Sequence, residues 1–157
     1  MKTILLFTDG SVDVQSKIGY GAFLAFQETE EIPENLPELV NTKRFENTSS
    51  SKLELQILLW ALQNIEPVNS KIVAFTDSQN IVGLPARRQR FEKNDYHNKK
   101  GELIKNHRLY KDFFQQTDKL DIEFVKVKGH RKTAQKDNVD KIFTVVDRAS
   151  RYALRGE

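Results

Sequence analysis

The order of strand-like and helix-like segments constrains the fold of this chain more than any other feature of its sequence. Short segments rich in β-branched and aromatic residues are predicted as strands at residues 3–8, 20–26, 42–46, 71–76 and 121–127. Helices are predicted at residues 51–65, in part of 87–114 and at 139–154, with a short helix ending at Gly83. Three successive strands favour an antiparallel meander, and strands separated by helices are usually parallel. The order predicts an α/β fold with a five-stranded mixed sheet, three antiparallel strands followed by parallel strands, flanked by helices.

Length and composition narrow the class of protein. A chain of 157 residues with 38% hydrophobic content is long enough for one core, so we expect one domain over residues 1–157. The chain has no cysteine, which excludes disulfides, thiolate zinc sites and cysteine nucleophiles. The apolar run that begins at Met1 stops at Thr8, too short for a signal peptide or membrane span. We expect a cytoplasmic monomer with no membrane partner.

Charge is distributed unevenly along the chain. The segment from Gln27 to Asn41 carries five glutamates and no basic residue, and we interpret it as a solvated loop. Basic residues dominate the segments 84–114 and 126–136. The net charge of +3 favours a nucleic-acid partner only weakly over an ordinary solvated surface.

Three carboxylates stand where predicted strands end or helices begin. Asp9 follows the first strand, Glu54 lies in the first turn of the first helix, and Asp77 follows the fourth strand. Active sites of α/β folds commonly occupy such positions. Each residue alone also has a purely structural interpretation: Asp9-Gly10 as a tight turn, Ser51 to Glu54 as a capping box, and Asp77 as a helix cap.

The sequence around these carboxylates resembles type 1 ribonuclease H. The resembling motifs are Phe-Thr-Asp-Gly-Ser at residues 7–11, Lys-Leu-Glu-Leu at 52–55, Phe-Thr-Asp-Ser-Gln at 75–79 and Val-Lys-Gly-His at 127–130. They occur in the family's order over most of the chain. The resemblance implies an endonuclease that cuts the RNA strand of RNA/DNA hybrids and leaves 5′-phosphate and 3′-hydroxyl ends.

The resemblance also implies a fourth carboxylate, for which there are two candidates. The family's spacing from the histidine leads to Asp140, whereas the pattern from Asp147 to Ala153 is similar to the family's last helix. We favour Asp147, although Phe143 stands where the family often has asparagine. The structural alternatives are an ion pair of Asp147 with Arg151 and a first-turn acid at Asp140.

Metal and substrate residues follow from the same resemblance. Asp9, Glu54, Asp77 and Asp147 are expected to hold two Mg²⁺ ions, which Mn²⁺ can replace, and His130 is expected to act in proton transfer or product release. The residues expected to contact the hybrid are Gly10, Ser11, Ser51, Arg87, Arg88, Arg90 and Lys128. The alternatives are a non-catalytic nucleic-acid-binding module and another nuclease of the same fold. Exonucleases of this fold typically begin with Asp-x-Glu, which Asp9-Gly10-Ser11 does not match.

Overall fold

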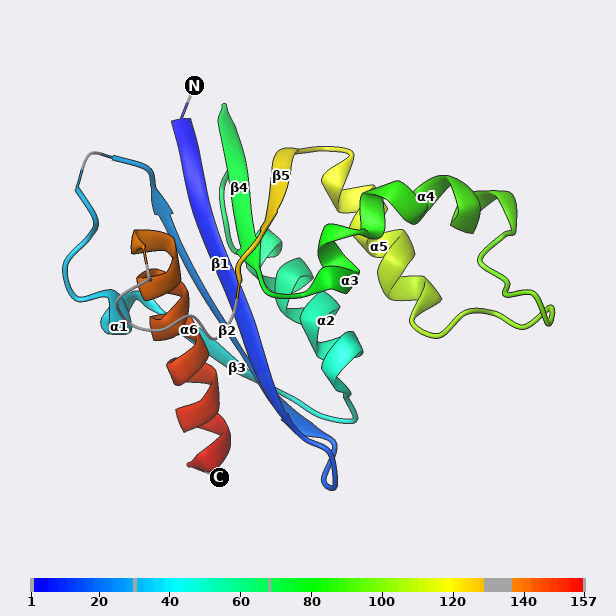
Figure 1. Ribbon diagram of the computed structural model, residues 1–157, viewed down its shortest axis with the longest axis horizontal. Coiled ribbons are helices and arrows are strands. Elements are labelled where there is room, and N and C mark those ends of the chain that lie inside the picture. Colours follow the sequence, from blue (N-terminus) through cyan, green and yellow to red (C-terminus); the bar gives the residue numbers. More distant parts are fainter. Residues whose placement is uncertain (1, 30, 68, 129–136, 157) are drawn as a thin grey trace.

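A five-stranded mixed sheet forms the centre of the molecule. The computed structural model describes residues 2–29, 31–67, 69–128 and 137–156. The strands are β1 (Lys2–Asp13), β2 (Ile18–Gln27), β3 (Asn41–Phe45), β4 (Ser70–Thr76) and β5 (Asp121–Lys126), in the order β3-β2-β1-β4-β5 (Figure 1). β1 to β3 pair antiparallel, whereas β4 pairs parallel with both β1 and β5. This arrangement confirms the predicted fold class.

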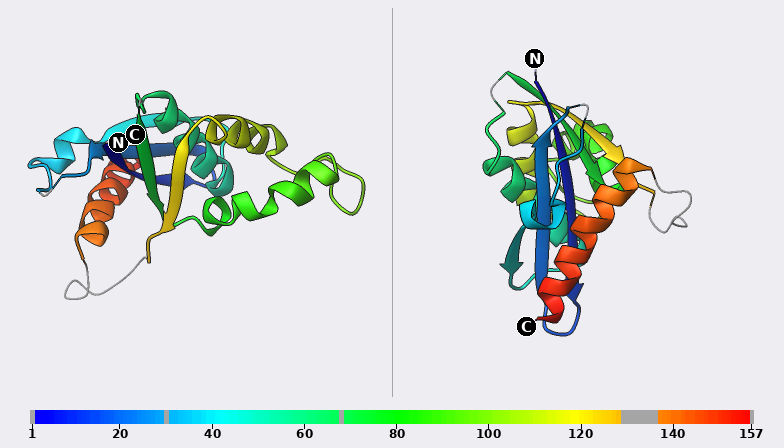
Figure 2. Two further views of the ribbon diagram at one scale, coloured as in Figure 1. Left: turned by 90° about the horizontal axis from the view of Figure 1, so that it is seen from above. Right: turned by 90° about the vertical axis from the view of Figure 1, so that its left-hand side faces the viewer.

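Helices cover both faces of the sheet. They are α1 (Leu36–Leu39), α2 (Ser50–Gln63), α3 (Gln79–Val82), α4 (Leu84–Lys93), α5 (His107–Thr117) and α6 (Asn138–Arg155). α2 and α5 pack on one face, and α6 crosses β1 and β2 on the other (Figure 2). No helix in the described ranges is long and apolar enough to cross a membrane.

The alternation of side chains along the strands creates two apolar cores. Leu6 of β1 and Ile72 of β4 point to the α2 face, where they join Phe113 of α5. Phe7 and Phe75 point to the other face and stack at 4.7 Å between ring centroids, in a cluster that includes Val146 of α6. Burial on both faces fixes the register of β1 and β4 and the face of α6 that packs on them.

The first strand is longer than predicted. β1 continues past Asp9 to Asp13, and Asp9 pairs with Ala22 in the middle of the β1–β2 hairpin. Gly10 lies opposite Gly21, and a Cβ on Gly21 would lie 2.3 Å from Cγ1 of Ile57. The two glycines allow α2 to pack closely on the sheet. Because β1 continues through Asp9 and Gly10, the interpretation of these residues as a tight turn is wrong.

Other boundaries also differ from the prediction. Ser49, not Ser51, caps α2 by accepting a hydrogen bond from the amide of Lys52, and Ser78, not Asp77, caps α3. The acidic segment after β2 contains the short helix α1, and the basic segment divides into α4 and α5. Both serine caps satisfy amides at helix starts, so neither Glu54 nor Asp77 is needed as a cap.

Candidate active site

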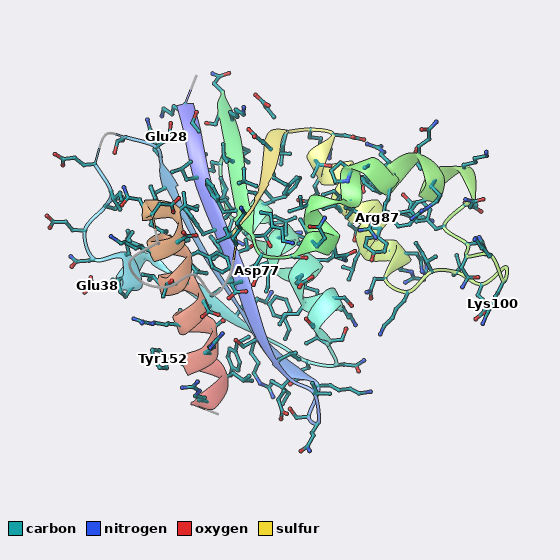
Figure 3. The ribbon with its side chains drawn as sticks, in the orientation of Figure 1. Glu28, Glu38, Asp77, Arg87, Lys100 and Tyr152 are labelled. Carbon is teal, nitrogen blue, oxygen red and sulfur yellow. The ribbon has the colours of Figure 1, made fainter. Side chains whose placement is uncertain are left out.

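Asp9 and Asp77 lie beside each other because β1 and β4 run parallel in register. Phe7 pairs with Phe75, and each aspartate follows its phenylalanine by two residues. Side chains two apart in a strand share a face. Asp9, and Asp77 just beyond the end of β4, are therefore directed toward the α6 side. Figure 3 labels Asp77 near the centre of the molecule, between α6 and the helices of the other face.

The helix α6 brings Asp147 to this point. Val146, the preceding residue, is fully buried in the cluster around Phe7 and Phe75, which fixes the rotation of the helix. A side-chain hydrogen bond with Asp147 contributes to the raised pKa of Asp9, and the Asp147 side chain keeps 26% of its surface exposed. Oδ1 of Asp147 also accepts a hydrogen bond from Nε of Arg151 at 3.1 Å. The predicted ion pair with Arg151 therefore exists together with the contact to Asp9.

Glu54 approaches from the opposite face of the sheet. It lies in α2 and lines a cavity of about 140 Å³ together with Asp9 and Asp77. The hydroxyl of Ser78 donates a hydrogen bond to Oε2 of Glu54 at 2.6 Å and accepts one from the amide of Ile81. Ser78 is 4% exposed, so one buried hydroxyl both caps α3 and orients Glu54.

Burial and neighbouring negative charge raise the pKa values of Asp9 and Glu54. Burial, the hydrogen bond to Asp147 and the negative charges of Asp77 and Asp147 raise the pKa of Asp9 from 3.8 to about 9, against a lowering by the amide of Gly10. Burial also raises the pKa of Glu54, with a further contribution from the charge of Asp77, while the Ser78 hydrogen bond lowers it. Ionisation of these groups is unfavourable unless positive charge enters the cluster.

Asp140, the alternative fourth carboxylate, has a structural role at the start of α6. Its side chain accepts a hydrogen bond from the amide of Asp137 at 3.3 Å, and its amide donates to the Asp137 side chain at 2.9 Å. This reciprocal pair is a capping box. Asp147 is thus the acidic residue of α6 that contributes to the raised pKa of Asp9.

The donor chemistry of the cluster suits a hard divalent cation. Asp9, Glu54, Asp77 and Asp147 offer carboxylate oxygens, the ligands that Mg²⁺ and Mn²⁺ prefer, and a cation would offset the repulsion that raises the pKa of Asp9. Among the residues described, no three His, Asp or Glu side chains are already spaced as a closed metal site. The residues therefore fit a metal by charge and ligand type, and small side-chain rotations would be needed to bind it.

The predicted substrate residues near the carboxylates have distinct environments. Ser11 shares a hydrogen bond of 3.0 Å with Ser150 of α6, and Gly10 packs against the side chains of Leu53 and Ile57. Ser51 lies half-buried in the first turn of α2, and Lys128 is exposed just after β5. His130 lies outside the described residues.

The three predicted arginines lie on α4. We call residues 84–117, which contain α4 and α5, the basic arm; Figure 3 labels Arg87 and Lys100 on it. Nη2 of Arg87 donates to both the carbonyl and the side-chain oxygen of Asn80 at 2.6 Å.

Arg88 and Arg90 differ in their partners. Arg88 pairs with Glu92 and Asp118 and lies 4.9 Å from the ring centroid of Phe114, whereas Arg90 is exposed. Arg87 and Arg88 thus have structural partners within the arm and toward α3.

Sequence patterns did not single out all the residues that support the site. Ser78 was part of a motif, yet its bond to Glu54 joins residues that are far apart in the chain. Two further hydrogen bonds also join residues that are far apart in the chain. Ser150 bonds with Ser11, and Oε1 of Gln79 accepts a hydrogen bond from Lys126 at 3.0 Å. The Thr-Asp-Ser-Gln motif was the signal that could have directed attention to Ser78 and Gln79.

Comparisons with known proteins identify the family of this chain. A ribonuclease H from Clostridium botulinum (strain Hall) is 25% identical over 150 residues, covering 90% of this chain and 93% of its own length. One from Pseudoalteromonas atlantica is 29% identical over 133 residues, covering 83% of this chain and 80% of its own. The solution structure of the PFV RNase H domain superposes with a TM-score of 0.73 at 13% identity, over 96% of this chain and 92% of that one. The family model for RNase H matches residues 1–148, a range that includes all four carboxylates, and the chain therefore belongs to the RNase H family.

Proposed function

We propose that this protein is a type 1 ribonuclease H, a metal-dependent endonuclease that hydrolyses the RNA strand of RNA/DNA hybrids. The observation that carries the proposal is the convergence of Asp9, Asp77 and Asp147 from β1, β4 and α6, with Glu54 lining the same cavity as the first two. A cluster of repelling carboxylates destabilises a fold, and its presence is best explained by binding of divalent cations.

The four carboxylates would hold two Mg²⁺ ions, with Mn²⁺ as a substitute. Bound there, the ions would activate the attacking water and stabilise the leaving 3′ oxygen, which gives 5′-phosphate and 3′-hydroxyl products. The chain's own contribution is to orient the ligands. Ser78 fixes Glu54 through its hydroxyl, and Arg151 holds one oxygen of Asp147. His130 is proposed to transfer a proton or to assist product release.

Contacts to the hybrid are proposed for the groups around the cluster. Gly10 lines the cavity with Asp9 and Asp77, Ser11 follows Asp9 by two residues on β1, and Ser51 lies in the first turn of α2. We propose that these three residues meet the sugar and phosphate of the cut strand. Lys128 and Arg90 are exposed and can neutralise phosphates at short range. Because Arg87 and Arg88 have partners within the protein, we propose that they hold the basic arm in shape and contact substrate only secondarily. We expect the enzyme to act as a cytoplasmic monomer.

The test is cleavage of matched, end-labelled nucleic acids. RNA/DNA, RNA/RNA, DNA/DNA and single-stranded RNA would be incubated with the protein in Mg²⁺, in Mn²⁺ and in chelator. The expected result is cutting of the RNA of the hybrid alone, and only with metal. If the folded protein cuts none of the four with either metal, the proposal is wrong and a binding module is the better description.

A further inference from the structure

The outer side of α6 carries an exposed basic and aromatic surface that the predicted site does not include. We call Arg148, Tyr152 and Arg155 the α6 outer stripe. All three side chains are exposed, and Tyr152 has 65% of its surface accessible, the second-highest value among the large exposed hydrophobic residues. Figure 3 labels Tyr152 on the side of α6 that faces away from the sheet.

Helix geometry places the stripe next to the catalytic cluster. With 3.6 residues per turn, Arg148, Tyr152 and Arg155 fall within about 60° of one another around the helix axis. Asp147 lies about 100° from Arg148 around the helix axis. Arg151, which forms an ion pair with Asp147, lies between these two residues. The cationic side chains therefore form a continuous path that starts at Asp147 and leads around α6.

The charge of this surface is of one sign. The two acidic residues of α6 are Asp140, which is buried in the capping box, and Asp147, which belongs to the cluster. No hydrogen bond or ion pair joins the side chain of Arg148 or Arg155 to another described residue, although both lie in α6. Arg87 and Arg88 of the basic arm contrast with them, since both are engaged by oxygen atoms of the protein.

The position of the stripe complements that of the basic arm. In Figures 1 and 2 the arm extends from one side of the molecule and α6 lies on the other, with the ends of β4 and β5 between them. A duplex that reaches the carboxylates while lying along the arm would extend toward α6. Unpaired arginines beside an exposed tyrosine offer phosphate contacts and an apolar surface for a sugar.

We propose that the α6 outer stripe binds the sugar-phosphate backbone of the nucleic-acid duplex on the side of the carboxylates opposite the basic arm. This inference rests on the proposed function, since the RNA/DNA hybrid is the intended duplex. It adds Arg148, Tyr152 and Arg155 to the binding surface, and it extends the footprint of the protein on its substrate to both sides of the cut.

The experiment compares salt dependence of hybrid binding in two variants with equal loss of charge. Arg148→Gln combined with Arg155→Gln removes two cations from the stripe, and Lys2→Gln combined with Lys119→Gln removes two exposed cations near the opposite end of the strands. Binding of a fluorescently labelled hybrid would be followed by anisotropy in chelator, so that it is not cut, from 50 to 200 mM salt.

The stripe variant should bind more weakly, with a salt slope reduced by about 1.8, because each lost phosphate contact removes about 0.9. Its deficit relative to the parent should therefore shrink by about tenfold across this salt range. Tyr152→Ala should weaken binding without changing the slope, and the lysine control should match the parent.

The outcomes separate this inference from the proposed function. If the parent binds and cuts the hybrid while the stripe variant keeps the parent's slope and affinity, only the inference is overturned. If the parent binds through the stripe but cuts nothing with either metal, the proposed function fails and the inference stands. Absence of hybrid binding by the parent overturns the inference, and the cleavage test with metal then decides the proposed function.

Discussion

Replacing Asp9 by asparagine should stabilise the metal-free protein, and the gain should grow as pH rises. In the unfolded chain the pKa of Asp9 is 3.8, and in the folded protein burial, the hydrogen bond to Asp147 and the charges of Asp77 and Asp147 raise it to about 9. Between these two pH values the folded state retains a proton that the unfolded state has lost, so stability falls as pH rises through this window. Asparagine cannot ionise and therefore does not suffer this loss.

The structure sets a scale for the effect. Each pH unit between the two pKa values is worth about 1.4 kcal/mol, which gives an upper limit of about 7 kcal/mol for ionised Asp9. Asp147 is 26% exposed, so rotation of its side chain and entry of water can relieve part of the repulsion. We expect Asn at this position to add about 2 to 4 kcal/mol of stability at pH 8, and close to none at pH 4.

The assay is urea denaturation in chelator from pH 4 to pH 9, followed by the fluorescence of the single tryptophan. Trp60 packs edge-on against Phe23 at 4.7 Å between ring centroids, so its emission should report loss of the core. Asp13→Asn is the matched control on the same strand, because Asp13 is exposed and its pKa is lowered by hydrogen bonds from Ser16 and Gln15. The control should show no gain in stability as pH rises.

Two results would refute the reasoning about Asp9. One is an Asp9→Asn protein that is less stable than the parent at every pH, which would mean that the carboxyl group has a structural role. The other is a gain that does not change with pH, which would show that the charge of Asp9 is not the cause. Added Mg²⁺ should narrow the difference in stability between the Asp9→Asn protein and the parent. It would bind the folded parent, and a ligand that binds only the native state stabilises it.

Three further predictions concern other parts of the site and its support. Asp147→Asn should abolish hybrid cleavage, whereas Asp140→Asn should retain it and lower stability by at most about 1 kcal/mol, because a neutral amide oxygen is a weaker acceptor for the Asp137 amide in the capping box; cleavage and urea denaturation measure the two effects. Ser78→Ala should lower kcat and weaken Mg²⁺ binding in titration calorimetry, with rescue by Ser78→Thr; unchanged metal binding would contradict an orienting role for this hydroxyl. Gly21→Ala should cost about 1 to 3 kcal/mol, because the new Cβ would lie 2.3 Å from an atom of α2; unaltered thermal stability would show that α2 can move away.

Much of the fold follows from local sequence patterns. The strands around Phe7 and Phe75 and the helix before Asn64 have clear apolar patterns and clear ends, and their order leaves few topologies. The continuation of β1 beyond Asp9 could not be predicted, because Asp-Gly usually favours a turn. Gly10 instead serves a contact with α2, and that contact joins residues far apart in the chain.

Local sequence patterns also do not define the whole candidate site. The motifs identify Asp9, Glu54 and Asp77 as candidates, but spacing from His130 leads to Asp140 while the local pattern favours Asp147. The rotation of α6 decides which of the two reaches Asp9, and that rotation depends on packing of Val146 against Phe7 and Phe75. The partners of surface arginines also could not be predicted from the sequence, because Arg88 meets Asp118 only when α4 and α5 are folded together.

The parallel pairing of β1 with β4 also has a consequence for how the protein is made. Lys2 pairs with Ser70 and Phe7 with Phe75, so β1 can complete its pairing only after the long segment between the two strands has been synthesised. Contacts of such long sequence separation slow folding, and α6 leaves the ribosome after all five strands of the sheet. The nascent chain should thus remain free of the mutual repulsion of Asp9 and Asp147 until α6 has been synthesised, when the strands on which α6 packs are already available.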